Sequence, residues 1–212
     1  MAVSELPHID VVLLSHDHHA DNLDDAGREL LATVGEVVTT SSGARRLGGA
    51  TRGLKPWETI NLEAGGKSVI EVTATPARHG PPLSRPIAGE VIGFAIRWLG
   101  QKHGSMWITG DSVPFRGMER VAQRLEVGLA IIHLGSVKFG ITGPIRYSMT
   151  ARESVGLSQR LGARTIVPVH YDGWSHFAEG RADLERELDM APEDLRLKYR
   201  FLAMGIPSAV TA

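Results

Sequence analysis

Five short apolar runs in this 212-residue chain each lead to a side chain that can bind a metal ion. These side chains are His16, His79, Asp111, His133 and His170. Apolar runs of this length predict buried strands, and the ligands of open α/β sheets gather beyond the carboxyl ends of the strands. The sequence therefore predicts that imidazole and carboxylate groups collect at one edge of a sheet.

The densest group of candidate ligands follows the first predicted strand. His16 and His18 flank Asp17, and imidazoles two residues apart in an extended turn project to one side, where they can share one cation. Asp21 lies one turn further on, and its carboxylate suits a second cation. Asp111 is the only acid at a predicted strand end in this set. Because a carboxylate has two oxygens, Asp111 is the natural bridge between two ions.

The composition limits both the metal chemistry and the class of partner. The chain has no cysteine, so nitrogen and oxygen atoms must hold the metal, and we expect zinc, with manganese or iron as alternatives. A formal net charge of −1 favours a small-molecule substrate and provides no basic surface for a nucleic acid. No apolar stretch approaches the roughly 18 residues of a membrane span, and no signal peptide is evident. We therefore expect a cytoplasmic protein.

Periodicity predicts a single α/β domain over residues 1–212. The expected strands are 9–14, 37–40, 68–75, 129–134 and 165–169, with a hairpin formed by 93–99 and 105–109. The expected helices are 23–34, 115–125, 150–162 and 181–188, and a helical turn is expected at 44–47. A capping box from Thr150 to Glu153 marks the start of the third helix. The segment 195–202 is compatible with either a strand or a helix.

Five motifs occur along the chain in a fixed order, at 14–18, 75–80, 109–112, 147–153 and 168–171. Together they resemble the metallo-β-lactamase fold hydrolases, and specifically the branch of L-ascorbate-6-phosphate lactonase and N-acyl-phosphatidylethanolamine phospholipase D. The resemblance implies a four-layer αββα sandwich, a metal pair at one edge and hydrolysis by water. The metal ligands that it implies are His16, His18, Asp21, His79, Asp111 and His170.

The first motif departs from the family pattern, which is His-x-His-x-Asp-His. Residues 16–22 read His-Asp-His-His-Ala-Asp-Asn, with one additional residue before Asp21 and Asn22 in place of the last histidine. The second metal position is therefore expected to lose a ligand. Three outcomes are open: Asp21 still binds after a small loop adjustment, which we favour; His19 takes over as a ligand; or one ion binds tightly and another weakly.

The position of the first motif is also unusual, because the chain begins almost at this motif. Family members carry several strands before it, so the resemblance predicts an amino-terminally shortened fold. Apolar sheet surface without those strands would favour a homo-oligomer that covers it.

The expected activity is metal-dependent hydrolysis of a small ester, lactone or phosphodiester. A metal-bound hydroxide is the expected nucleophile, because a bound ion lowers the pKa of water from about 15.7 toward 7. Asp21 and Asp111 are the candidate catalytic carboxylates, and Asp21 could relay a proton. Further candidates, for substrate contact, are His133, His176, Lys138 and Arg146. The alternative is a non-catalytic metal-binding or interaction protein with a degenerate second metal position.

Overall fold

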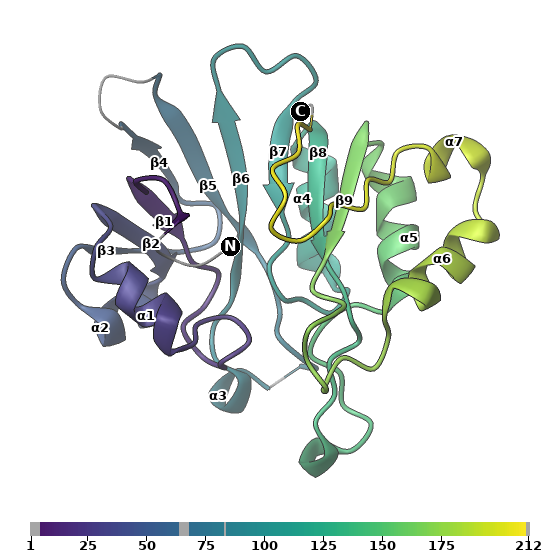
Figure 1. Ribbon diagram of the computed structural model, residues 1–212, viewed down its shortest axis with the longest axis horizontal. Coiled ribbons are helices and arrows are strands. Elements are labelled where there is room, and N and C mark those ends of the chain that lie inside the picture. Colours follow the sequence, from purple (N-terminus) through teal and green to yellow (C-terminus); the bar gives the residue numbers. More distant parts are fainter. Residues whose placement is uncertain (1–4, 64–67, 83, 211–212) are drawn as a thin grey trace.

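Two β-sheets pack face to face in the centre of the molecule (Figure 1). The computed structural model describes residues 5–63, 68–82 and 84–210. The first sheet is parallel, with the order β1 (Val11–Leu13), β2 (Glu36–Thr40) and β3 (Thr51–Leu54). The second sheet is mixed and has the order β4 (Thr59–Leu62), β5 (Ile70–Pro76), β6 (Ile92–Trp98), β7 (Ser105–Ile108), β8 (Val127–His133) and β9 (Thr165–Val169).

Helices cover the outer faces of both sheets (Figure 1). Those beside the first sheet are α1 (Asp25–Leu31) and α2 (Ser41–Leu47). Those beside the second sheet are α4 (Arg116–Arg124), α5 (Ala151–Leu161) and α6 (Arg181–Asp189). Two single-turn helices, α3 (Arg85–Ala88) and α7 (Glu193–Arg196), and a 3-10 turn at Gly140–Thr142 lie in connecting segments.

Separate apolar clusters fill the spaces between these four layers. In β2, Val37 packs toward the α1 side, whereas its neighbour Val38 faces the second sheet, because successive strand residues point to opposite faces. Between the sheets, Val38 and Phe94 of β6 belong to one buried cluster. Outside the second sheet, Trp107 and Leu184 belong to one cluster that includes residues of α4, α5 and α6. The predicted αββα sandwich is confirmed.

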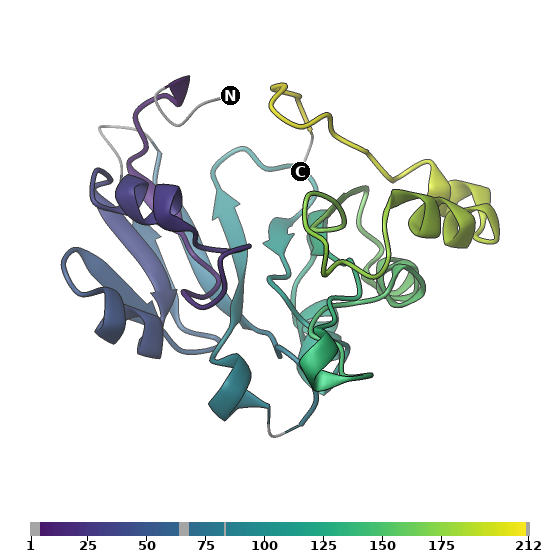
Figure 2. The ribbon, with the colours of Figure 1, turned by 60° about the horizontal axis from the view of Figure 1, so that its bottom comes forward.

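Strand direction brings the candidate ligands to one edge. Both β5 and β7 pair with β6 in antiparallel register, while β8 and β9 run parallel to β7. These four strands consequently end at the same edge, at the bottom of Figure 1. Figure 2, with that edge brought forward, shows the segment after β1 extending toward the loops that follow β8 and β9.

Most predicted elements are present, with boundaries that differ by one to a few residues. The strands β3 and β4 were not predicted, because each has only four residues and a partly exposed face, and so gives no continuous apolar run. The segment 195–202 combines both predicted options. Its helical turn ends at Arg196, and Tyr199 then forms a parallel bridge with Ile166 of β9.

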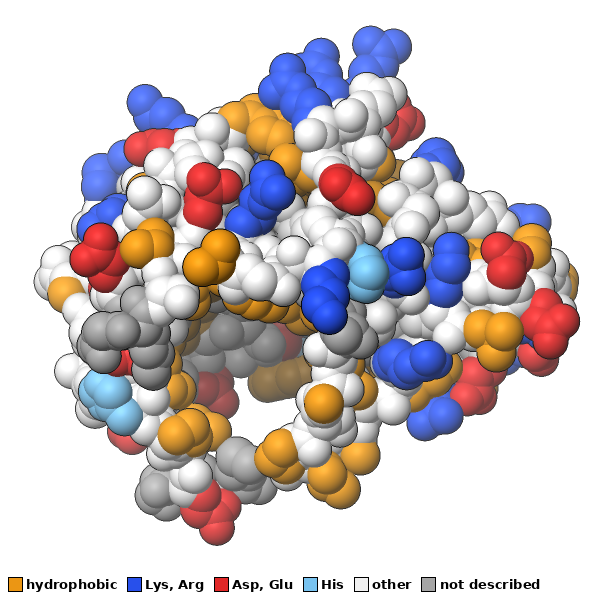
Figure 3. All heavy atoms as spheres, turned by 90° about the horizontal axis from the view of Figure 1, so that it is seen from above, with side chains coloured by type: hydrophobic (Ala, Val, Ile, Leu, Met, Phe, Trp, Pro, Cys, Tyr) orange, Lys and Arg blue, Asp and Glu red, His pale blue; other side chains and the backbone are white. Residues whose placement is uncertain are grey.

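The end of the molecule opposite the ligand-bearing edge exposes apolar side chains. Ile70 of β5 pairs with Trp98 of β6, both are partly exposed, and Leu99 in the following turn is 88% exposed. Figure 3 looks onto this end and shows hydrophobic side chains around a hollow. The predicted homo-oligomer stays a prediction. Within the described parts of the chain, no helix is long and apolar enough to cross a membrane.

Candidate metal centre

Three of the predicted ligands lie together beyond the ends of β1, β5 and β7. One ligand atom from each of His16, His79 and Asp111 lies within 4.8 Å of the other two, and all three residues are buried. Zinc ligands lie about 2.0–2.2 Å from the ion. A group this compact needs only small movements to share one ion.

The imidazoles from the second sheet are oriented by backbone carbonyl groups. His79 Nδ1 donates to the carbonyl oxygen of Tyr147 at 2.9 Å, and His170 Nδ1 donates to that of Leu134 at 2.9 Å. Since a carbonyl oxygen only accepts, Nδ1 is the donor in both rings, and Nε2 is the nitrogen left to bind a metal ion. Both Nε2 atoms are buried and have no hydrogen-bond partner. A bound metal ion would supply the missing partner of each of these nitrogen atoms.

His16 is oriented by side chains instead. The amide of Asn22 donates to the His16 carbonyl oxygen, and its Oδ1 accepts from Ser15 Oγ at 3.3 Å. The single hydroxyl proton of Ser15 is used in the bond to Asn22. Ser15 Oγ therefore accepts a hydrogen bond from His16 Nδ1, at 2.9 Å. His16 Nε2 is left buried and unpartnered, and burial lowers the pKa of His16 to about 3. The imidazole is thus neutral and ready to bind a cation.

A second group of ligand atoms surrounds His170 at the end of β9. His170 Nε2 lies 3.3 Å from Asp111 Oδ2 and 3.7 Å from Asp21 Oδ2, and Asp21 Oδ2 lies 2.8 Å from His176 Nε2. Two ligands at about 2.1 Å from a tetrahedral ion are separated by roughly 3.4 Å, so these distances suit one shared cation. Asp111 belongs to both groups, which is the arrangement expected of a bridging carboxylate.

The electrostatics of the second group favour positive charge. Burial acts to lower the pKa of His170, but the carboxylates of Asp111 and Asp21 raise it to about 9. Burial acts to raise the pKa of Asp21, but the neighbouring imidazoles of His170 and His176 lower it. Two buried carboxylates close to each other therefore attract a cation. Without one, a proton on His170 partly balances their negative charge.

The adjacent histidines of the first motif point in different directions. The His18 ring packs on Gly89, and its Nδ1 lies 3.6 Å from Asp17 Oδ1. His18 is therefore not part of the compact group around His79. The His19 ring centroid, in contrast, lies 5.2 Å from that of His79. Metal binding by His18 stays a prediction.

The predicted substrate contacts lie in different surroundings. His133 is beside the centre, with its ring centroid 5.8 Å from that of His170, and burial lowers its pKa to about 4. The Lys138 side chain is exposed, and its backbone N–H donates to the His176 carbonyl oxygen. Arg146 forms two hydrogen bonds with Glu153, of 2.6 and 2.9 Å. This guanidinium is thus engaged at the start of α5.

The turn before Asp111 requires a residue without a side chain. Gly110 has a φ of +62°, and a Cβ atom there would lie 2.7 Å from the carbonyl oxygen of Ile92. His19 and His170 also have positive φ values, of 65° and 64°. Left-handed backbone is uncommon outside glycine and costs free energy, and such residues cluster at functional sites.

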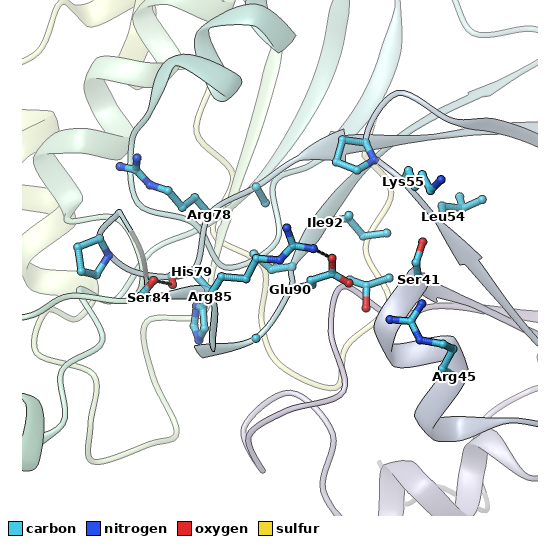
Figure 4. A pocket seen from close by; sticks show the side chains of 16 residues that line it. Ser41, Arg45, Leu54, Lys55, Arg78, His79, Ser84, Arg85, Glu90 and Ile92 are labelled. Carbon is cyan, nitrogen blue, oxygen red and sulfur yellow. Dashed lines mark hydrogen bonds and ion pairs between the residues drawn. The ribbon is translucent and has the colours of Figure 1, made fainter. Parts of the chain in front are cut away.

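A cavity of about 610 Å³ adjoins the centre at His79 (Figure 4). Its walls come from the ends of β2 and β3 and from the segment between β5 and β6. Figure 4 shows Arg85 paired with Glu90 in its middle and Arg45 and Lys55 on the side of α2 and β3. Among the described residues, the charged groups of Arg45 and Lys55 form no hydrogen bond or ion pair, so this wall is available to an anion.

Comparison with known proteins settles the family. The model of the Beta-lactamase superfamily domain matches residues 2–171. The chain belongs to this superfamily. A UPF0173 metal-dependent hydrolase from Methanoregula boonei is 28% identical over 198 residues, which cover 86% of this chain and 77% of that protein. Another, from Pyrobaculum aerophilum, is 26% identical over 182 residues, 84% of this chain and 72% of that protein.

A solved structure extends the likeness to the whole fold. The isothiocyanate hydrolase from Delia radicum gut bacteria has a TM-score of 0.79 and 21% identity, and the match covers 100% of this chain and 82% of that one. The predicted fold is confirmed, and so is the predicted class of enzyme, the metal-dependent hydrolases of this superfamily. Membership of the lactonase and phospholipase D branch stays a prediction.

Sequence reasoning missed the residues that orient the ligands. Ser15 gives no signal, because serine before a histidine is common. The carbonyl partners of His79 and His170 have no sequence signature at all. The contact between His176 and Asp21 joins residues 155 positions apart, and only the fold brings them together.

Proposed function

We propose that this hydrolase uses one or two divalent ions, zinc before manganese or iron, to cleave a small ester, lactone or phosphodiester. The observation that carries the proposal is the set of three buried Nε2 atoms without partners, on His16, His79 and His170, around the buried carboxylate of Asp111. Unpaired buried polar atoms are costly, so three of them together around a buried carboxylate support a bound metal ion. The cytoplasm is its expected compartment.

The residues divide between two cation positions that share Asp111. His16 and His79 would hold the first ion, and Asp21 and His170 the second. Ions bound in this way lower the pKa of a water molecule and polarise a carbonyl or phosphoryl oxygen.

The protein itself supplies charge, orientation and a proton acceptor. Burial acts to raise the pKa of Asp111, but the imidazoles of His170 and His16 lower it, so this carboxylate is ionised at neutral pH. The Asp21 carboxylate, also ionised, is the candidate proton acceptor when it is not fully engaged as a ligand of the second ion. His133 is held in place by Thr109, whose Oγ1 accepts from the His133 backbone N–H at 3.0 Å. Its neutral ring forms a wall beside the carboxylates.

The cavity beside His79 is the proposed place for the rest of the substrate. Arg85 is neutralised by Glu90, whereas Arg45 and Lys55 are unpaired among the described residues. A carboxylate or phosphate on the substrate would pair with them. Within the three substrate classes, we therefore favour a molecule that carries an acidic group away from the scissile bond.

Hydrolysis assays with matched substrates test this function. Esters, lactones and phosphodiesters, each with and without a distal carboxylate or phosphate, are compared using zinc-loaded protein, metal-stripped protein and the His79→Ala variant. We expect turnover only by the zinc-loaded protein and a lower KM for the acidic members, which Arg45→Ala and Lys55→Ala should raise. Metal binding without turnover of any substrate would favour the alternative of a non-catalytic metal-binding or interaction protein.

A further inference from the structure

The first metal position needs a ligand from the motif loop besides His16, and two adjacent histidines are available. We propose that His19, and not His18, is this ligand. The inference rests on the proposed metal-dependent function, since it concerns the same centre. It also explains how the chain accommodates the additional residue in its motif.

The surroundings of His19 match those of a ligand. Its ring centroid lies 5.2 Å from that of His79 and 6.1 Å from that of His16. The His19 backbone has a φ of 65°, a left-handed conformation that is uncommon outside glycine and recurs at functional sites. Phe139 stacks on the imidazole with ring planes 23° apart, which restrains its orientation. His19 is solvent-exposed, so it would close the open side of the position.

The packing of His18 holds its ring outside the compact group, although its buried Nδ1 has no hydrogen-bond partner among the described residues. Its ring fills the space above Gly89, where a Cβ atom would lie 2.3 Å from His18 Cε1. Asp17, next to it, is buried and receives two hydrogen bonds of 2.6 Å from Arg46. This ion pair fixes Asp17 against α2, and His18 Nδ1 lies 3.6 Å from Asp17 Oδ1. A rotation of His18 into the centre would have to break that packing.

A different contact carries a second proposal, for the position that Asn22 leaves without an imidazole. The Asn22 amide is already used by Ser15 and His16. His176 Nε2 lies 2.8 Å from Asp21 Oδ2, and Phe139 and Phe177 hold its ring at centroid distances of 5.1 and 5.0 Å. We propose that an ion at the second position replaces the proton shared by His176 Nε2 and Asp21 Oδ2, so that His176 is the replacement ligand of this ion.

Zinc affinity and cobalt spectra separate His19 from His18. Each residue is replaced by alanine in the full chain. Zinc affinity is measured by competition with a chromophoric chelator, and the visible absorption of the Co²⁺-loaded protein reports loss of an imidazole. For His19→Ala we expect the affinity of the first position to fall more than about 100-fold, with a changed cobalt spectrum. His18→Ala should stay within about tenfold of wild type, with the wild-type spectrum.

The outcomes distinguish this inference from the function on which it rests. Loss of affinity in His18→Ala, alone or together with His19→Ala, would overturn the assignment, as would an unchanged His19→Ala. A wild-type chain that binds no metal would instead refute the proposed function. Circular dichroism of both variants controls for folding. Because His19 is exposed, His19→Ala should stay folded.

Two substitutions distinguish a ligand role for His176 from mere orientation of Asp21. Glutamine keeps a donor for Asp21 but does not replace an imidazole ligand, whereas alanine removes both. We expect His176→Ala and His176→Gln alike to reduce bound zinc from about two ions per chain to about one. A His176→Gln protein that keeps two ions would overturn the assignment. His8→Ala, at a histidine whose side chain is 78% exposed, is the matched control.

Discussion

The two sides of the metal centre are built by different means. On the second sheet, His79 and His170 follow strand ends and are oriented by backbone carbonyls. On the first sheet, the loop of residues 15–22 is oriented by side chains, through Asn22 on His16 and Arg46 on Asp17. Backbone-held ligands depend on the fold alone. A side-chain-held loop can change its spacing, provided that its partners change with it.

The largest effect is expected at the residue that both sides share. Asp111→Ala should abolish binding of both ions and hydrolysis, a loss well above the roughly 10–100-fold cost of removing an outer partner of a ligand. Elemental analysis gives the ions per chain. Asp172→Ala, at an exposed carboxylate after β9, should keep its metal. Retention of one tightly bound ion by Asp111→Ala would show that the two sides are independent.

Metal removal should destabilise the whole centre. Zinc at about 1,000 times its Kd contributes about 4 kcal/mol to the folded state, which corresponds to a rise of roughly 8–16 °C in Tm for a chain of this size. The physical source is the cluster of buried carboxylates and unpartnered imidazoles. Thermal unfolding of metal-stripped protein with and without zinc measures the effect, and an unchanged Tm would contradict the proposed centre.

Removing a side-chain partner should harm the loop side. Asn22→Ala frees Ser15 and leaves the His16 tautomer unfixed, so zinc affinity should fall by about 10–100-fold. Asn61→Ala, at an exposed position of β4, is the control. Equal affinities in chelator competition would show that His16 needs no side-chain support, and the contrast with the carbonyl-held side would then disappear.

Arg46→Ala should act on stability more than on chemistry. It leaves the buried Asp17 carboxylate unpaired, and we expect a loss of about 1–3 kcal/mol in the free energy of unfolding, reduced by the partial exposure of Arg46. Urea unfolding of metal-stripped protein measures it. Arg164→Ala, at an exposed arginine outside the motif loop, should cost less than about 0.5 kcal/mol.

The smallest effect is expected for the ion pair of Arg146 and Glu153 at the start of α5. Burial acts to raise the pKa of Glu153, but Arg146 and the Thr150 backbone N–H lower it. The stabilisation is therefore present above the unfolded pKa of about 4.3 and is lost as the pH falls through the lower folded value. Glu153→Gln should cost less than about 1 kcal/mol at pH 7, and nothing once the pH is well below the folded pKa of Glu153. A pH-independent difference in urea unfolding would contradict the ion pair.

The sequence predicted those parts of the fold and centre that short segments determine. Apolar runs marked β5, β8 and β9, and the capping box of Thr150 and Glu153 marked the start of α5, where both of its hydrogen bonds are present. The placing of His79, Asp111 and His170 at one edge followed from strand direction. The strands, the helix start and the shared edge all depend on local sequence pattern and sheet geometry.

What the sequence could not predict depends on contacts between distant segments. Spacing alone does not say whether residue 18 or residue 19 faces the centre, because Arg46 and Gly89 decide it. The engagement of Arg146 by Glu153 likewise depends on how the loop before α5 returns to its helix. His176 was expected near substrate, and its approach to Asp21 is visible only once β9 and the motif loop are side by side.

The absence of a side chain at Gly89 is coupled to the sequence of the first histidine motif. Gly89 has a φ of +79°, and even a methyl group on it would overlap the His18 ring. The lengthened first motif therefore requires a residue without a side chain in the segment before β6, where the His18 ring packs. Natural chains that share the His-Asp-His-His spacing should also have glycine at this position. In a homologue with the lengthened motif and a larger residue there, the side chain equivalent to His18 would have to pack elsewhere.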